Sequence, residues 1–253
     1  MAASQKSRID VLLVERGLVP SRERARALIL AGRVLVSEQK VEKPGATVPA
    51  DAPVRLLGED LQYVSRGGLK LVAALDRWAI EIAGRVCIDV GASTGGFTDC
   101  LLQRGAARVT AVDTGFGQIA MKLRNDARVR LMERTNARLL EKGLLGDEAT
   151  LLVMDVSFIS ATLVLPAVVE AAPGLREMVV LVKPQFEAGR GNVGKGGIVR
   201  DPEAHRLAVE RVAECVRGLG WLVAGTMDSP ITGMEGNREF LLWARRPRDS
   251  FIE

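Results

Sequence analysis

The sequence has little of what several common classes of protein depend on. Its three cysteines, Cys87, Cys100 and Cys215, are far apart and in no C-x-x-C spacing, so neither a disulfide framework nor a zinc cluster is indicated. The only histidine is His205. Serine-histidine and cysteine-histidine hydrolase chemistry, and metal sites with several histidines, therefore lack their main residue. We expect no metal site, and we expect His205 to be a solvated residue on a helix.

Long apolar segments are also missing. The longest run without a charged residue covers 156–169, and its 14 residues include a proline. A membrane-spanning helix needs about 20 apolar residues. The first ten residues, MAASQKSRID, have no apolar core of the kind found in signal peptides. We therefore expect a cytoplasmic protein with no membrane span, and the sequence indicates no stable protein partner.

Positive charge is concentrated in the first part of the chain. The 35 lysines and arginines exceed the 31 acidic residues by four. Residues 1–70 hold 12 basic and 8 acidic side chains, whereas residues 71–253 hold 23 of each. Because nucleic acids are polyanions, this imbalance favours a nucleic-acid-binding module near the N-terminus.

The residues up to about position 57 have the pattern of a small α+β module. Apolar residues three and four apart predict a helix over 8–16 and a second one from the candidate N-cap Ser21 to Gly32. Short strands are expected over 34–41, as a hairpin, and over 54–57.

This module resembles a known RNA-binding domain. The resemblance rests on an arginine before the first helix, on SRERARALILAGRVLV and on VEKPGATV. The same order of residues occurs in the alpha-L RNA-binding domain of ribosomal small-subunit protein four, and it covers roughly residues 7–60. The alternative is that these are solvated surface charges with no partner. The resemblance implies that RNA phosphates are contacted by Arg8, Arg22, Arg26 and Lys43, and we add Arg66 as a further candidate.

From residue 85 the pattern changes to short apolar runs that alternate with helices near 96–104, 117–124, 136–142 and 160–172. Such alternation predicts a parallel sheet with helices on both faces. A helix over 202–218 leads to a strand over 221–227, and a loop then leads to a last strand over 239–244. A strand reached by a loop must run antiparallel to its partner. This ending is typical of the seven-stranded methyltransferase form of the doubly wound, Rossmann-like α/β fold.

The sharpest local motif is DVGASTGGFTDC at 89–100, a strand end followed by a glycine loop and a helix. Its G-x-x-x-G-G spacing is neither the dinucleotide fingerprint nor the phosphate loop. S-adenosylmethionine has no phosphate, and its ribose needs a nearby acid such as Asp113. The alternatives are a plain strand-to-helix turn for the glycines and a helix N-cap for Asn136. The candidate cofactor residues are Asp89, Gly91, Ser93, Gly95, Gly96, Phe97, Asp113, Asn136 and Ala137.

Four charged residues lie at positions where a purely structural core would not need a charge. Lys70 lies between the two regions, Asp155 and Lys183 end predicted strands, and Glu239 begins the last one. The motifs YVSRGGLKL, DVGASTGGFT, ERTNAR, MDVSFIS, LVKPQFE and NREFLLW resemble FtsJ-like ribose 2′-O-methyltransferases. With the N-terminal module, the chain resembles the TlyA family, long labelled haemolysins. Position by position, the family's Lys-Asp-Lys-Glu catalytic tetrad falls on these four residues.

The resemblance implies an S-adenosylmethionine-dependent enzyme that methylates the 2′-hydroxyl of a cytidine in ribosomal RNA within ribosomal subunits. It also implies three parts: an RNA-binding domain over 1–60, a linker over 61–69 and a methyltransferase domain over 70–253. The alternatives are a non-catalytic RNA-binding or ribosome-assembly factor and a membrane-active haemolysin.

The chemistry of the tetrad fits this reading, because a ribose hydroxyl must lose a proton while the sulfonium methyl is already activated. We expect Lys183 to lie nearest the hydroxyl and Asp155 and Glu239 to orient the Lys183 side chain. Lys70 is expected to balance charge or to bind the substrate. A purely structural ion-pair network is the alternative. The glycine-rich segment between Lys183 and Asp201, which contains Arg190, Lys195 and Arg200, suits a basic lid over RNA.

Overall fold

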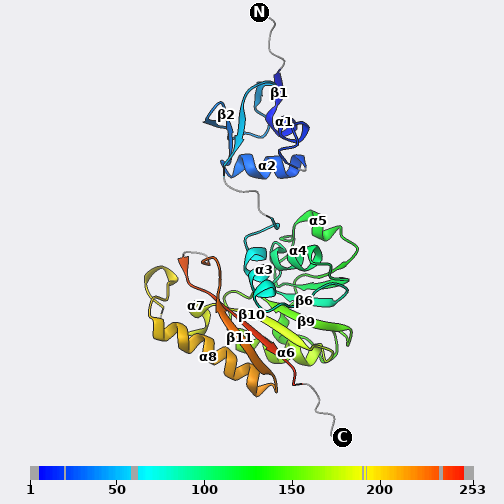
Figure 1. The fold of residues 1–253 in the computed structure, drawn as a ribbon, viewed down its shortest axis with the longest axis vertical. Coiled ribbons are helices and arrows are strands. Elements are labelled where there is room, and N and C mark those ends of the chain that lie inside the picture. Colours follow the sequence, from blue (N-terminus) through cyan, green and yellow to red (C-terminus); the bar gives the residue numbers. More distant parts are fainter. Residues whose placement is uncertain are drawn as a thin grey trace, which may run out of the picture. The chain divides into compact units, whose positions relative to one another are not determined.

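The computed structural model describes residues 6–19, 21–57, 62–189, 191, 193–233 and 236–247, except for the side chain of Lys195. The chain forms two compact units, Met1–Asp60 and Leu61–Glu253 (Figure 1). We describe each unit by itself.

The smaller unit has the expected two helices and short strands. Ser21 caps the second helix, because its Oγ accepts a hydrogen bond from the Arg24 backbone N–H at 3.2 Å. The core is formed by apolar side chains of both helices, including Ile9, Leu13 and Ile29, each of which is fully buried. The elements are β1 (Lys6–Arg8), α1 (Ile9–Glu15), α2 (Arg22–Leu30), β2 (Val34–Val36), β3 (Gln39–Lys40), β4 (Thr47–Pro49) and β5 (Val54–Leu56). β1 pairs with β4, and β2 lies between β3 and β5, all antiparallel.

The larger unit contains a seven-stranded sheet in the order β11-β12-β10-β9-β6-β7-β8. The five strands from β6 to β10 are parallel, as the alternating pattern predicts. β12 runs antiparallel to both of its neighbours, β10 and β11, so the expected reversal of the last strand is confirmed. The strands are β6 (Val86–Val90), β7 (Arg108–Val112), β8 (Val129–Met132), β9 (Ala149–Met154), β10 (Glu177–Val182), β11 (Leu222–Asp228) and β12 (Phe240–Arg245).

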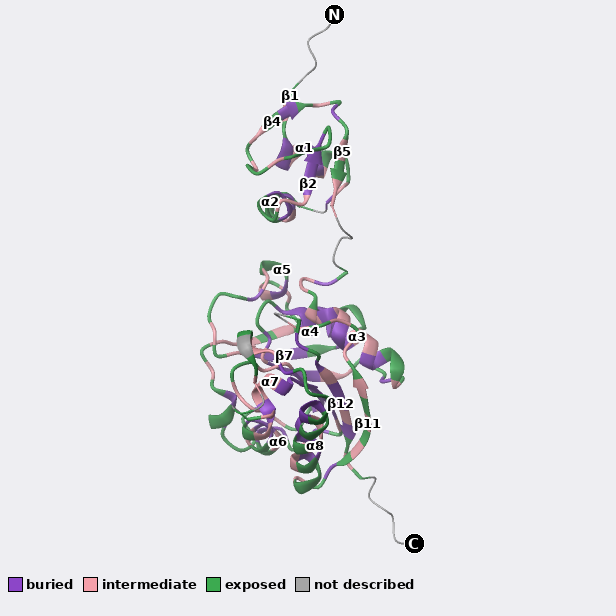
Figure 2. Cartoon of the chain, turned by 90° about the vertical axis from the view of Figure 1, so that its left-hand side faces the viewer, coloured by how far each residue is buried: buried purple, intermediate pink, exposed green. Residues whose placement is uncertain are grey.

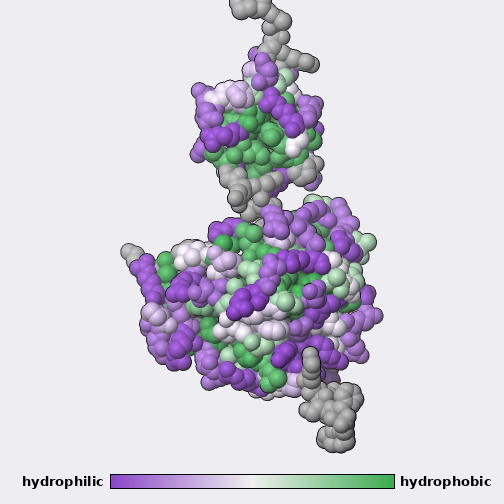
Figure 3. All heavy atoms as spheres, viewed as in Figure 1, coloured by the Kyte–Doolittle hydropathy of each residue, from purple (hydrophilic) through white to green (hydrophobic). Residues whose placement is uncertain are grey.

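Helices cover both faces of this sheet, which makes the fold doubly wound. Along β9, Leu151 and Val153 pack with α3 and α4, whereas Leu152 and Met154 pack with α6 and α8. Buried residues therefore fill the strands and the inner sides of the helices (Figure 2), while hydrophilic residues spread over much of the face seen in Figure 3. The helices are α3 (Gly67–Arg77), α4 (Gly96–Gln103), α5 (Met121–Arg124), α6 (Leu165–Ala171), α7 (Pro184–Glu187) and α8 (Pro202–Gly218), with 3-10 turns η1 (Ala137–Leu139), η2 (Ala161–Leu163) and η4 (Lys195–Gly197).

Three local expectations need correction. The segments expected to be helical over 117–124 and 136–142 contain only the single turns α5 and η1. Residues 62–69 are not a free linker, because Tyr63 is 2% exposed and packs in the core of the larger unit, and α3 already begins at Gly67. His205 is buried, not solvated: its Nε2 lies 2.9 Å from the Val199 carbonyl oxygen and its ring packs against Phe240.

Candidate active site

The ends of the strands bring the predicted tetrad to one edge of the sheet. Asp155 directly follows β9 and Lys183 directly follows β10, and the two strands are parallel neighbours. Glu239 directly precedes β12, whose first residue Phe240 pairs with Val182. Because β12 is antiparallel, its beginning lies where β10 ends, so Lys183 and Glu239 flank the same edge.

A cavity of about 760 Å³ lies at this edge. All four tetrad residues line it, together with the candidate cofactor residues Gly91, Ser93, Gly96 and Phe97 and with Arg66. Asp89, Gly95, Asp113, Asn136 and Ala137 are not among the described residues that line it.

The tetrad forms two ion pairs. The Lys70 Nζ lies 2.5 Å from Glu239 Oε2, and the Lys183 Nζ lies 2.5 Å from Asp155 Oδ1. The two lysine side chains are each 10% exposed, Glu239 is 2% exposed and Asp155 is 21% exposed. Burying an ammonium is unfavourable unless an acid accompanies it, so the pairing explains how two lysines remain beside one cavity.

A third group holds Lys183 in place. The Lys183 Nζ donates a hydrogen bond to the Ser157 Oγ at 2.7 Å. An ammonium has three donors, and Asp155 and Ser157 engage two of them. A further hydrogen-bond partner in the cavity would complete the set. The motif analysis did not single out Ser157, although it lies only two positions after the strand-end acid.

The glycine loop is closely packed, which explains why glycine is needed there. Gly91 has a φ of +86°, and a Cβ at this position would lie 2.3 Å from the Asp155 carbonyl oxygen. A Cβ at Gly96 would lie 2.3 Å from the Ser65 Oγ. The loop therefore fits between the end of β9 and the segment before α3, and any larger residue would push these apart.

The acids beneath and beside the loop have distinct roles. Asp113 accepts hydrogen bonds from the backbone N–H groups of Ser93, at 2.7 Å, and Gly115, at 2.6 Å, and so fixes the loop. Asp89 is completely buried, and its Oδ2 accepts a hydrogen bond from the Thr98 hydroxyl at 2.6 Å, while its Oδ1 has no partner among the described residues. Burial raises the pKa of Asp89 to about 7.

In the segment after β8, Asn136 caps the 3-10 turn η1. Its Oδ1 accepts a hydrogen bond from the Arg138 backbone N–H at 3.1 Å, which is the alternative that the sequence left open. Ala137 is buried behind it.

Two aromatic side chains that the motif analysis did not identify also line the cavity. Phe158 is 91% exposed with a φ of +64°, and its ring centroid lies 5.5 Å from that of Phe186. Both residues line the cavity. An exposed ring at the wall of the cavity can contact a bound ligand, and its exposure could not be read from the sequence.

A buried acid secures the segment that carries Asp155, Ser157 and Phe158. Glu187 of α7 accepts hydrogen bonds from the Ser160 hydroxyl at 2.5 Å and from the Ala161 backbone N–H at 2.7 Å. It is 3% exposed, and burial raises its pKa. The segment after β9 is thus tied to the segment after Lys183.

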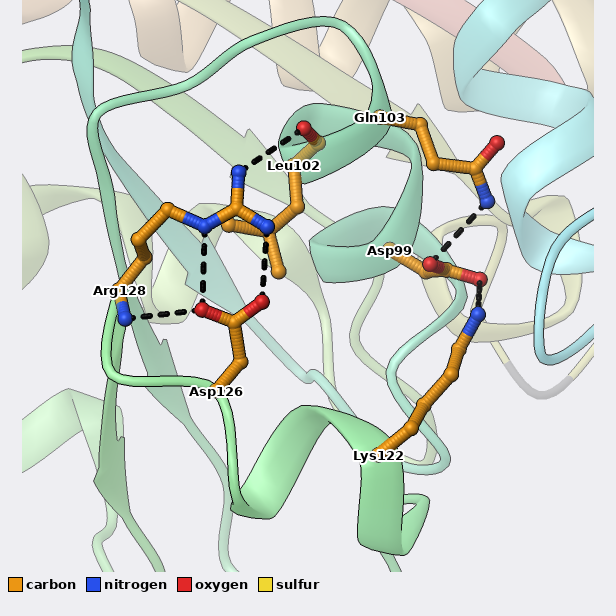
Figure 4. A network of polar contacts seen from close by, with 6 residues as sticks. All are labelled: Asp99, Leu102, Gln103, Lys122, Asp126 and Arg128. Atoms are coloured by element: carbon orange, nitrogen blue, oxygen red, sulfur yellow. Dashed lines mark hydrogen bonds and ion pairs between the residues drawn. The ribbon is translucent and has the colours of Figure 1, made fainter.

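A second buried acid secures the chain where it enters the larger unit. Asp99 of α4 accepts hydrogen bonds from the Val64 backbone N–H at 2.8 Å and from Gln103, and it forms an ion pair with Lys122 at 2.9 Å. Figure 4 shows Lys122 and Gln103 converging on this carboxylate. These contacts join α4, α5 and the segment that leads to Lys70.

The glycine-rich segment after α7 is tied down by Asn237. The side chain of Asn237 accepts a hydrogen bond from the Val199 backbone N–H and donates one to the Gly197 carbonyl oxygen, each at 3.0 Å. Arg200 is exposed. Arg190 and the side chain of Lys195 lie outside the described residues.

The RNA-contact candidates divide between the two units. Arg8, Arg22, Arg26 and Lys43 are on the smaller unit, and Arg22, Arg26 and Lys43 are exposed. Arg8 and Arg22 both contact Asp10. Arg66 belongs to the larger unit, where it lines the cavity.

Every described helix falls short, in length or in apolar character, of what crossing a bilayer requires. Within the described residues, no group of three or more His, Cys, Asp or Glu side chains is arranged as a metal site would need.

Comparisons with known proteins identify the family of each unit. The FtsJ-like methyltransferase family matches residues 63–246, and the S4 domain matches residues 7–54. A relative from Mycobacterium tuberculosis, named 16S/23S rRNA (cytidine-2′-O)-methyltransferase TlyA, is 48% identical over 97% of this chain and 92% of its own length. Hemolysin A of Brachyspira hyodysenteriae is 40% identical over 92% of this chain and 98% of its own length.

Among solved structures, a provisionally named hemolysin from Streptococcus thermophilus is 43% identical and covers 96% of this chain and 90% of its own, with a TM-score of 0.70. The family model covers most of the chain, and the relatives cover nearly all of it. The chain therefore belongs to the FtsJ-like methyltransferase family, and within it to the TlyA group that carries an N-terminal S4 domain.

Proposed function

We propose that the protein transfers a methyl group from S-adenosylmethionine to the 2′-hydroxyl of a cytidine in ribosomal RNA, within ribosomal subunits in the cytoplasm. The observation that carries this proposal is the pair of lysine–carboxylate contacts lining one cavity with the glycine loop. The name of the Mycobacterium tuberculosis relative states the same reaction for that protein.

The residues of the site suit the proposed cofactor. A cavity of about 760 Å³ has the size of an ordinary small-molecule site. Gly91, Ser93 and Gly96 offer backbone on one side of it, and Phe97 offers an apolar surface. Asp89 lies outside the cavity lining and is completely buried, and its bond to the Thr98 hydroxyl ties the end of β6 to α4, on either side of the glycine loop. Bound S-adenosylmethionine supplies an activated methyl group.

The tetrad residues position the ribose 2′-hydroxyl, which is the nucleophile, and remove its proton. Asp155 and Ser157 hold the Lys183 Nζ at the cavity wall. The Lys183 ammonium first releases one proton to solvent, and the resulting amine accepts the proton that the ribose hydroxyl gives up as its oxygen bonds to the methyl group and the sulfonium–methyl bond breaks. Lys70 and Glu239, paired on another part of the same wall, orient the ribose and balance charge.

Methyl incorporation tests the proposal directly. The purified protein is incubated with labelled S-adenosylmethionine and with small or large ribosomal subunits, each separately, and nucleosides are then analysed by mass spectrometry. We expect 2′-O-methylcytidine, and we expect the linkage after the modified nucleotide to resist alkali. A methyl group on a base, or no incorporation into either subunit, would refute the proposal.

Calorimetry tests the cofactor part independently. The wild-type protein should bind S-adenosylmethionine saturably, and Asp113→Ala should bind it more weakly because the loop at Ser93 loses its anchor. No binding heat with the folded wild-type protein would contradict this assignment.

A further inference from the structure

A buried carboxylate lies at the centre of the predicted RNA-binding surface. Asp10, the second residue of α1, is completely buried although it is charged. Arg8 donates to both of its oxygens, from Nε to Oδ1 and from NH2 to Oδ2, each at 3.0 Å. Arg22 donates from NH2 to Oδ2 at 2.9 Å. Two arginines from different elements therefore meet at one acid.

The outer sides of these arginines remain available. The side chains of Arg8 and Arg22 are 54% and 56% exposed, whereas Asp10 is not exposed at all. Each guanidinium has five N–H donors, and Asp10 engages two from Arg8 and one from Arg22. Most of the donors and a net charge of +1 thus face solvent.

The segment that carries Lys43 lies against the same group. The backbone N–H of Ile9 donates to the Ala46 carbonyl oxygen at 2.9 Å, and that of Asp10 donates to the Pro44 carbonyl oxygen at 3.3 Å. Gly45 lies beside the Arg8 guanidinium, whose Nη2 would be 3.6 Å from a Cβ at that position, an ordinary van der Waals contact. Three segments of the chain, around residues 8, 22 and 44, are therefore fixed relative to one another.

We propose that Asp10 is a positioning residue that holds Arg8 and Arg22 as a preformed fork for the phosphates of the RNA substrate. This inference rests on the proposed function, since it assumes that the smaller unit binds RNA. A free arginine must lose side-chain freedom when it binds a phosphate, whereas an arginine already held by a buried acid loses less. The two guanidiniums hold the pKa of Asp10 well below its usual range, Arg8 contributing most, so the acid stays charged at neutral pH.

For Asp10→Asn, the inference predicts a change in RNA affinity opposite to the one that net charge alone would give. Asp10→Asn makes the protein more positive by one charge, which alone would strengthen RNA binding. We expect instead that it weakens binding to ribosomal subunits about tenfold. Glu38→Gln is the matched control, because Glu38 also pairs with an arginine, Arg55, through both of its oxygens, but both side chains are exposed. The control should bind at least as tightly as the wild-type protein.

A second set of variants keeps the net charge and leaves Asp10 in place, in case Asp10→Asn unfolds the smaller unit. Arg8→Lys and Arg22→Lys retain the positive charge but lose the forked geometry, so each should weaken subunit binding several-fold. Arg55→Lys is the control, since Arg55 also makes a two-point contact with an acid, Glu38, but is not one of the RNA-contact candidates. It should change binding less than twofold. All variants should keep the wild-type hydrogen-exchange protection of the amides of α1 and α2, which unfolding of the smaller unit would abolish.

Dissociation constants for purified ribosomal subunits, measured over a range of salt concentrations, decide between the outcomes. Binding by Asp10→Asn as tight as that by Glu38→Gln would overturn the inference, and so would equal affinities for Arg8→Lys, Arg22→Lys and Arg55→Lys. If the wild-type protein binds no subunit, the proposed function fails instead, so the two failures are distinguishable.

Discussion

The two units pair arginines or lysines with acids in opposite ways. In the smaller unit the acid, Asp10, is buried and its cations are more than half exposed. In the larger unit the cations, Lys70 and Lys183, are themselves nearly buried beside their acids. An exposed guanidinium can meet a phosphate without first losing much hydration, whereas a buried ammonium is shielded from bulk water and polyanions. The same kind of ion pair thus suits binding in one unit and proton transfer in the other.

The largest effect that this contrast predicts is at Lys183. Lys183→Ala should lower methyl transfer about 10²- to 10⁴-fold, because a group that moves a proton in the transition state is removed. Binding of the cofactor and of ribosomal subunits should be unchanged. Lys183→Arg should restore little, since arginine keeps its proton near neutral pH. Single-turnover rates at saturating cofactor measure this loss, and full activity of Lys183→Arg would leave charge alone as the role of Lys183.

In the smaller unit, by contrast, removing cations should weaken RNA binding and leave the rate of methyl transfer nearly unchanged. Replacing Arg22 and Arg26 together by alanine should raise KM for ribosomal subunits about 10- to 100-fold with little change in kcat at saturation. The slope of log affinity against log salt concentration should fall by about 0.7–0.9 for each phosphate that the protein no longer neutralises. An unchanged slope would assign phosphate binding to another surface, and Arg66 would be the next residue to replace.

A smaller effect on kcat is expected at Glu187, because this residue positions the segment after β9 and does not itself line the cavity. Glu187→Gln retains the shape of the side chain but replaces one acceptor oxygen by a donor, so one of the two bonds to Ser160 and Ala161 is broken. We expect kcat to fall about tenfold, within the loss that a small misplacement of catalytic groups produces. Glu203→Gln, on an exposed acid of α8, is the control. A wild-type kcat for Glu187→Gln would mean that the segment after Asp155 keeps its position unaided.

The smallest effect is one of stability and depends on pH. The folded-state pKa of Asp89 is about 7, above the value of about 4 in an unfolded chain. The contribution of Asp89 to stability should therefore be highest below pH 4, fall as the pH rises from 4 to 7, and level off above that. Asp89→Asn should remove this fall and raise the melting temperature by about 5 °C at pH 8, but not at pH 4. The same variant should bind S-adenosylmethionine more weakly, and a gain in both properties would exclude Asp89 from the cofactor site.

The parallel sheet and the reversed last strand were predictable because they follow from local patterns, whereas the family resemblance was needed to assign the tetrad. Strands that alternate with helices fix a parallel sheet, and parallel strands end at a common edge, so Asp155 and Lys183 had to lie close together. Glu239 could be added because a strand reached by a loop reverses direction.

Burial and side-chain partners were not predictable in the same way. His205 has the spacing of a helical residue, but only tertiary packing decides that it faces Phe240 and not solvent. The acids Asp10 and Glu187 look like ordinary surface residues in the sequence, and their partners lie on separate elements. The end of the first domain at residue 60 agrees with the division of the chain, but the start of the second domain was placed too late, at residue 70, because a polar and glycine-rich stretch hides the buried Tyr63.

The position of β12 also determines when the enzyme becomes competent during synthesis. The pair of Lys70 and Glu239 joins residues 169 positions apart, and β11 is hydrogen-bonded to β12 at the edge of the described sheet. The smaller unit needs only residues up to about 57 for its own core. At usual rates of translation, β12 follows about 180 residues and roughly 10–40 s later. Under the proposed function, the nascent chain has its RNA-binding unit during that interval but not its completed tetrad, so we expect it to associate with RNA before it can modify any.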